Sequence, residues 1–93
     1  MNADALPPVS DGAVKLGETI RMAMTIADDA ARSDIEYYCP SIPVEDWTFW
    51  DTSKPNVSDA LSLQRLFNAV NYLTLRGHIA QHATAPSLIR FTR

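Results

Sequence analysis

The hydrophobic pattern predicts two long helices that flank a segment without regular periodicity. In the first, apolar residues recur three and four positions apart, as they do along one face of an α-helix. Ser10 suits the cap position, so we predict a helix over residues 10–32 with this face buried. A glycine inside a helix costs about 1 kcal/mol relative to alanine. We therefore predict that Gly17 marks a point where another helix crosses closely. The apolar positions are Ala13, Leu16, Ile20, Ala23, Met24, Ala27, Ala30 and Ala31.

The middle of the chain, residues 33–57, is predicted to be a short helix and an irregular aromatic segment. Ser33 and Glu36 have the spacing of a capping box, which would start a new helical turn. Alternatively, the first helix continues to about Tyr38. A second ambiguity concerns residues 43–50, because a proline followed by two acids is typical of a first helical turn, whereas closely spaced aromatic residues favour a strand. Both alternatives stay open at this point.

The second long helix is predicted over residues 58–76. Asn56 or Ser58 would cap it, and Gly77 would end it in a left-handed conformation. An unbroken apolar face runs along this segment at helical spacing. Its members are Leu63, Leu66, Phe67, Val70 and Leu73.

After Gly77 the period changes from helical to alternating, which predicts a β-hairpin over residues 78–92. Its strands would lie near His78–His82 and Ser87–Thr92, with a turn near Ala83–Pro86. Residues 1–9, which include two prolines, are predicted to be an extended arm. The predicted fold is therefore a single domain over residues 1–93, mainly α with a small C-terminal β-hairpin.

Length and composition narrow the class of protein. A chain of 93 residues has room for one hydrophobic core. One cysteine provides no internal disulfide, which fits a reducing compartment. No apolar run approaches the ~20 residues that a membrane-spanning helix needs, and the first ten residues lack the basic start of a secretory signal. We therefore expect a cytoplasmic protein without a membrane segment.

The charges are distributed unevenly along the chain. Residues 1–57 carry ten acidic residues and four basic ones, whereas residues 58–93 carry one acidic residue and four arginines. The formal net charge of −3 thus conceals a basic C-terminal part. A polyanionic partner is expected to meet that part of the molecule.

The segment Tyr72-Leu73-Thr74-Leu75-Arg76-Gly77-His78-Ile79, at the junction of the second helix and the hairpin, resembles the C-terminal part of a winged helix-turn-helix domain. The resemblance covers residues 58–93 and implies a winged-helix-like α+β fold that binds duplex DNA. It departs from the family before this helix, where the short segment 43–50 is followed by a longer connection than the three- or four-residue turn of a helix-turn-helix.

The resemblance implies two kinds of contact to DNA. Amide and guanidinium side chains on the helix would read base edges in the major groove, and further arginines would contact phosphates. The first group is Gln64, Arg65, Asn68 and Asn71, and the second is Arg76, Arg90 and Arg93. A small DNA-associated regulatory protein is therefore the leading functional hypothesis, with a homodimer compatible with it.

The alternative hypothesis is a small interaction or inhibitor protein, of the kind that mobile elements such as phages encode, which binds a host protein. Aromatic side chains beside acidic ones are typical of protein-binding hot spots. The candidate partner-binding residues are Trp47, Trp50, Tyr38, Glu45 and Asp46.

The residues that could carry catalysis or bind a metal do not form a convincing motif. Cys39, His78 and His82 could act as zinc ligands, but histidines four apart on a strand do not converge as they do on a helix. A cysteine nucleophile needs a lowered pKa and an orienting partner, and nothing near Cys39 in the sequence supplies either. We therefore expect a protein that is not an enzyme and has no metal or cofactor.

Overall fold

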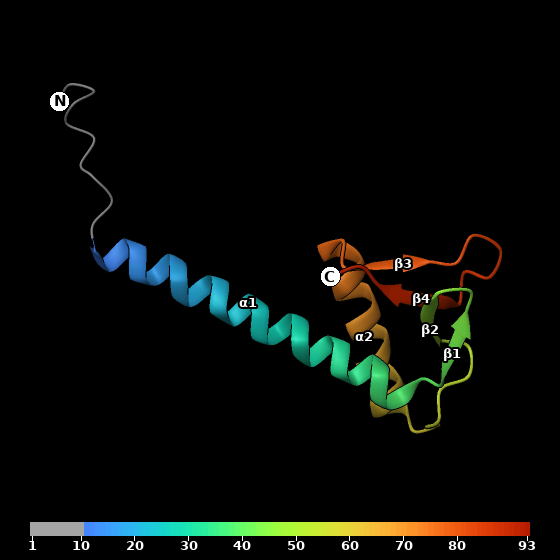
Figure 1. Cartoon of the computed structure of the whole chain (residues 1–93). Helices are drawn as coiled ribbons and strands as arrows, with labels where there is room; N and C mark the ends of the chain where they lie inside the picture. Colours follow the sequence, from blue (N-terminus) through green and yellow to red (C-terminus); the bar gives the residue numbers. More distant parts are fainter. Residues whose placement is uncertain (1–10) are drawn as a thin grey trace.

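The computed structural model describes residues 11–93, with side chains from Lys15 onward. Two helices and four strands follow one another as α1 (Asp11–Tyr38), β1 (Ser41–Val44), β2 (Trp47–Asp51), α2 (Ala60–Arg76), β3 (Ile79–Gln81) and β4 (Leu88–Phe91). The strands form one antiparallel sheet in the order β1-β2-β4-β3 (Figure 1). The fold is thus α+β, and the predicted arm at residues 1–9 and the predicted cap at Ser10 lie outside the described residues.

The hydrophobic core forms where the C-terminal part of α1, the inner face of α2 and the sheet meet. Trp50, Ile79 and Phe91 pack against it from the sheet. The two helices run in opposite directions. The Asn56 side chain, just before α2, donates to the Tyr37 carbonyl near the end of α1, whereas Arg76 at the end of α2 bonds to Asp28 in the middle of α1. The buried residues of this core are Ala31, Ile35, Tyr38, Cys39, Leu66, Ala69, Leu73 and Ile89.

The N-terminal part of α1 projects away from this core (Figure 1). Within the described residues, α2 lies beside α1 only from about Asp28 onward. We refer to residues 15–27 as the α1 arm; at a rise of 1.5 Å per residue it is about 20 Å long. Apart from the half-buried Gly17, every residue of the arm is exposed.

The first helix is longer than the predicted range 10–32 and follows the alternative that ran to Tyr38. Ser33 and Glu36 lie inside it, so they do not form a capping box at a new helix start. The expected burial of its apolar face is wrong for the arm, where Leu16 is 61% and Ile20 52% exposed. Gly17 marks no close crossing, because a Cβ added there would have open space around it.

The aromatic middle segment forms a β-hairpin, so the short helix predicted within residues 33–57 is wrong. β1 and β2 pair in register from Ser41↔Trp50 to Val44↔Trp47, and Glu45 in the turn has a left-handed backbone with φ 55°. Of the two interpretations of residues 43–50, the strand is the one observed. Local aromatic content indicated this conformation, whereas the proline and the two acids that favoured a helix belong to the hairpin edge and turn.

α2 agrees with the predicted second helix in its extent and its C-terminus but differs in its cap. Asp59 is the N-cap, and its carboxylate accepts a hydrogen bond from the Ser62 backbone N–H at 2.9 Å, in place of Asn56 or Ser58. Gly77 adopts the predicted left-handed conformation with φ 70°. The buried face shifts by part of a turn, so Ala69 is enclosed and Phe67 is 56% exposed.

β3 and β4 correspond in position to the two strands predicted after Gly77, but they do not form a separate small hairpin. β4 pairs with β2 as well as with β3, which places it inside a four-stranded sheet. Trp50 lies opposite Ile89, and Ile79 opposite Phe91. The hairpin expected from the sequence is thus half of a larger sheet, because the aromatic segment supplies two further strands.

Candidate functional site

A polar clamp joins the middle of α1 to the end of α2. Both oxygens of the Asp28 carboxylate accept hydrogen bonds from the Arg76 guanidinium, from Nε at 3.0 Å and from an Nη at 2.9 Å. His78 Nδ1 lies 3.6 Å from the same carboxylate. A bidentate pair of this kind is specific in geometry and holds the two helix segments together. Arg76, predicted as a phosphate contact, is therefore engaged inside the protein.

The clamp keeps the Asp28 carboxylate charged. Hydrogen bonding from Arg76 is the main reason that the pKa of Asp28 falls from its ordinary 3.8 to about 2, and Tyr72 and the charge of His78 act in the same direction against the effect of burial. The same contacts raise the pKa of Arg76. A carboxylate held in this state accepts hydrogen bonds but is poorly suited to take up a proton near neutral pH.

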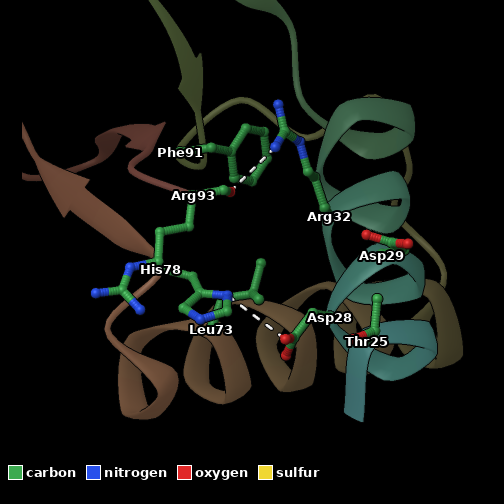
Figure 2. Close-up of a pocket in the computed structure, with 8 residues that line it drawn as sticks. All are labelled: Thr25, Asp28, Asp29, Arg32, Leu73, His78, Phe91 and Arg93. Atoms are coloured by element: carbon green, nitrogen blue, oxygen red, sulfur yellow. Dashed lines mark hydrogen bonds and ion pairs between the residues drawn. The ribbon is translucent and has the colours of Figure 1, made fainter. Parts of the chain in front are cut away.

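A small cavity of about 130 Å³ lies next to the clamp, between α1, the end of α2 and the C-terminal strand (Figure 2). In Figure 2, Arg32 extends from α1 toward Phe91 and donates a hydrogen bond to the Arg93 carbonyl at 3.1 Å. The Thr25 hydroxyl is turned back onto its own helix, where it donates to the Arg21 carbonyl. The polar groups around the cavity are thus largely occupied with contacts inside the protein.

The predicted base-reading residues lie on the exposed side of α2, and three of them, Gln64, Arg65 and Asn68, also line an open groove between α1 and α2. Gln64, Arg65, Asn68 and Asn71 are all exposed. The Gln64 amide donates to Asn68 Oδ1 at 2.9 Å, and Arg65 Nε lies 3.9 Å from the Asp34 carboxylate. This face therefore offers polar side chains to a partner, but its one cationic side chain, Arg65, lies beside the Asp34 carboxylate of α1.

A second surface combines arginines with aromatic rings. The Arg90 guanidinium lies over the Trp47 ring at 4.2 Å, and that of Arg32 over the Phe91 ring at 4.4 Å. The rings of Trp50 and Phe91 are in contact, with centroids 4.7 Å apart. Together they border an open hollow of about 260 Å³. We call this the Arg–aromatic surface; its members are Arg32, Trp47, Trp50, Arg90 and Phe91.

The structure does not bring the predicted nucleic-acid-binding residues onto one surface. Arg32 of the Arg–aromatic surface and Asp34 beside Arg65 are two positions apart on α1, and helical residues turn by about 100° each, so they point to opposite sides. Arg90 thus lies on one side of α1, and the α2 residues on the other. Arg93 lies on the Arg90 side, where its carbonyl accepts the bond from Arg32.

The five candidate residues of the protein-binding alternative are also divided. Tyr38 is buried in the core and Trp50 is half-buried against it. Glu45 and Asp46 are exposed in the β1–β2 turn, and the adjacent Trp47 is 53% exposed. The exposed part is thus one tryptophan with two acids, and this tryptophan is the one that stacks with Arg90.

Cys39 is buried at the end of α1. Burial, reinforced by the charge of Asp51, raises the pKa of its thiol to about 11, so very little thiolate forms near neutral pH. His82 is turned toward the sheet, where its ring meets the edge of Phe49 at 5.4 Å. Within residues 11–93, no three histidine, cysteine or acidic side chains gather as a metal site would require.

Sequence reasoning missed Arg32 and Phe91 of the Arg–aromatic surface. Arg32 ends the first predicted helix and Phe91 lies in the last predicted strand, and nothing local connects positions that are 59 residues apart. The contact of Phe91 with Trp50 depends on the pairing of β2 with β4, which the local sequence does not give.

Across the described part of the chain, neither helix combines the length and apolarity needed to cross a bilayer. Comparison with protein-family models, with curated proteins and with solved structures finds no match for this chain.

Proposed function

We propose that this protein binds nucleic acid through the Arg–aromatic surface and that it prefers unpaired nucleotides. The observation that carries the proposal is the pair of arginine–ring stacks, Arg90 on Trp47 and Arg32 on Phe91, whose four residues all line one open hollow. Bases stack on aromatic side chains and on guanidinium planes, and arginine also neutralises phosphates. The site thus offers both chemistries that a nucleotide requires.

Charge supports the same surface. An arginine positioned over an indole ring can still offer N–H groups to a phosphate. Among the described residues, Arg90 forms no ion pair, whereas Arg32 of the same surface lies 3.4 Å from the Glu36 carboxylate, Arg76 is held by Asp28 and Arg65 lies near Asp34. Arg90 is therefore the arginine of the Arg–aromatic surface that is best placed to meet a polyanion.

Unpaired nucleotides suit the hollow better than a duplex. A base enters a ring-lined hollow only when it is turned out of its stack, and a single strand offers such bases at little cost. Duplex DNA would instead be expected to contact the outer face of α2, where Gln64, Arg65, Asn68 and Asn71 are exposed. Since the two surfaces lie on opposite sides of α1, variants of each can be examined separately.

The test is fluorescence anisotropy of a labelled mixed-sequence single strand and of the matching duplex over a salt series. We expect Trp47→Ala to weaken binding of the single strand about tenfold or more, because one stacked base contributes ~1–3 kcal/mol. Arg90→Gln should weaken binding and reduce the salt dependence, since one phosphate contact is lost. Arg65→Gln, an exposed arginine on α2, is the matched control and should bind as the wild type does.

Three results would overturn this proposal. The first is the absence of binding at low salt, and the second is binding that Trp47→Ala leaves unchanged. The third is a preference for the duplex that depends on Arg65, which would transfer the function to the outer face of α2. Trp47 is half exposed, so its replacement should not unfold the protein. Circular dichroism of Trp47→Ala checks that the variant remains folded.

A further inference from the structure

The α1 arm carries an apolar surface that nothing in residues 11–93 covers. Between Thr19 and Ala27, Arg21 is the one charged residue among nine. Thr19 and Thr25 turn their hydroxyls onto the carbonyls of Lys15 and Arg21, which leaves their methyl groups toward solvent. A helix that is apolar on most sides is normally enclosed, and this one is exposed along its length.

One face of the arm continues the face on which α1 packs in the core. At about 100° per residue, Leu16, Ile20, Ala23, Ala27 and Ala30 lie within roughly 80° of arc. The same side carries Ala31 and Tyr38 farther along, where α2 and the sheet bury them. The arm therefore presents a packing face whose second helix is missing.

The open part of this face leads into a groove between α1 and α2. The groove has a volume of about 520 Å³ and is mostly apolar. Its α1 wall consists of Ala27, Ala30, Ala31 and Asp34. Its α2 wall consists of Leu61, Gln64, Arg65, Asn68, Ala69 and Tyr72. Small residues on one wall allow another helix to approach closely.

We propose that the occupant of this surface is a second copy of the chain, with the two α1 helices antiparallel and crossing near Ala23. This pairing places residue 16 of one copy near residue 30 of the other, and residue 20 near residue 27. The large side chains Leu16 and Ile20 then meet the small residues that wall the partner's groove. The surface is thus complementary to itself, as a two-fold interface requires.

Charge favours the antiparallel direction and disfavours the parallel one. The arm carries Lys15 and Arg21 against Glu18, a net positive segment. Residues 28–38 of α1 are acidic: even with Asp28 held by Arg76 and Asp34 beside Arg65, Asp29 and Glu36 outnumber Arg32. Antiparallel pairing lays the positive segment along the negative one, whereas parallel pairing would bring the acidic segments together.

The first experiment is sedimentation velocity of the full chain over a concentration series. We expect a reversible dimer that Ile20→Glu weakens at least about 100-fold, because it places a charge at the centre of the apolar contact. Met22→Glu is the matched control: it adds the same charge to the same helix at a position that is 65% exposed, about 160° away from Ile20. Met22→Glu should retain the dimer.

The second experiment tests direction. The variants Ile20→Cys and Ala27→Cys, each of which keeps the buried Cys39, are mixed and oxidised. Antiparallel pairing predicts that the mixed 20–27 disulfide forms faster than either symmetric one. A chain that stays monomeric at all concentrations would overturn the proposal and leave the arm to another protein. A dimer that Ile20→Glu does not weaken, or that gives mainly 20–20 and 27–27 disulfides, would also overturn it.

Discussion

The two parts of α1 have the same amphipathic pattern and opposite surroundings. From Asp28 to Tyr38, the apolar face lies against α2 and the sheet, and Ile35 is fully enclosed. From Lys15 to Ala27, the same face meets no other element, and Ile20 is 52% exposed. One helix thus contains a segment stabilised by tertiary packing and a segment that depends on its own propensity or on a partner.

The difference shows that a hydrophobic stripe specifies a surface to be covered but not what covers it. α2 has 17 residues, compared with 28 in α1, so an antiparallel α2 can cover only part of α1. The clamp between Arg76 and Asp28 marks the position on α1 where packing by α2 ends. Beyond this point, the sequence continues an apolar face for which the described chain supplies no second helix.

The largest expected effect separates the two parts directly. Ile35→Ala should lower the free energy of unfolding by ~2–5 kcal/mol, because it leaves a cavity in the core. Ile20→Ala removes the same atoms from the same helix at an exposed position, and in dilute protein it should change stability by less than about 0.5 kcal/mol. Urea denaturation at equilibrium measures both.

Protein concentration sharpens this comparison. If the arm pairs with a second copy, Ile20→Ala should become more destabilising as the concentration rises, whereas the effect of Ile35→Ala stays constant. Equal losses in dilute protein would contradict the view that the arm stands outside the core.

The elements with strong local signals could be predicted from the sequence. α2 has a periodic apolar face and a glycine that ends it in a left-handed conformation, and both signals are local. The prediction that Phe67 is buried was wrong. Which part of the apolar face of α2 is buried depends on where α1 packs against it, and the periodicity of α2 does not show that. The four-stranded sheet could not be predicted, since the pairing of β2 with β4 joins residues almost 40 positions apart.

The candidate sites show the same division. The exposure of Gln64, Asn68 and Asn71 followed from helical periodicity alone. Arg76 is not available to a phosphate because it bonds to Asp28, which is 48 positions away in the sequence. The stacking of Arg90 on Trp47 depends on the register of the sheet. Residue type predicted which side chains could bind a nucleotide, whereas tertiary contacts decide which of them are available.

The next effect concerns the clamp at the boundary between the two parts. The pKa of Asp28 is about 2 in the folded protein and 3.8 ordinarily, so its contribution to stability is present above pH ~3.8 and is lost as pH falls through about 2. Asp28→Asn should therefore lower the melting temperature at neutral pH, with a difference from wild type that narrows between pH 4 and 2. Asp29→Asn, on the exposed neighbour, is the control. A difference that is constant over this range would show that the clamp does not act through its charge.

The smallest expected effect compares a glycine from each part. Gly77 has φ 70°, a conformation that costs an L-residue roughly 1–2 kcal/mol, so Gly77→Ala should destabilise the core by about 1 kcal/mol. Gly17 is helical and a Cβ there meets nothing within 4 Å, so Gly17→Ala should favour the helical arm by up to ~1 kcal/mol. Because the arm contributes little to the core, this gain should appear as higher helicity in circular dichroism and slower amide exchange near residue 17, with the urea midpoint of the dilute protein nearly unchanged. A clear rise in that midpoint would mean that the arm unfolds together with the core, and the two parts of α1 would then be one cooperative unit.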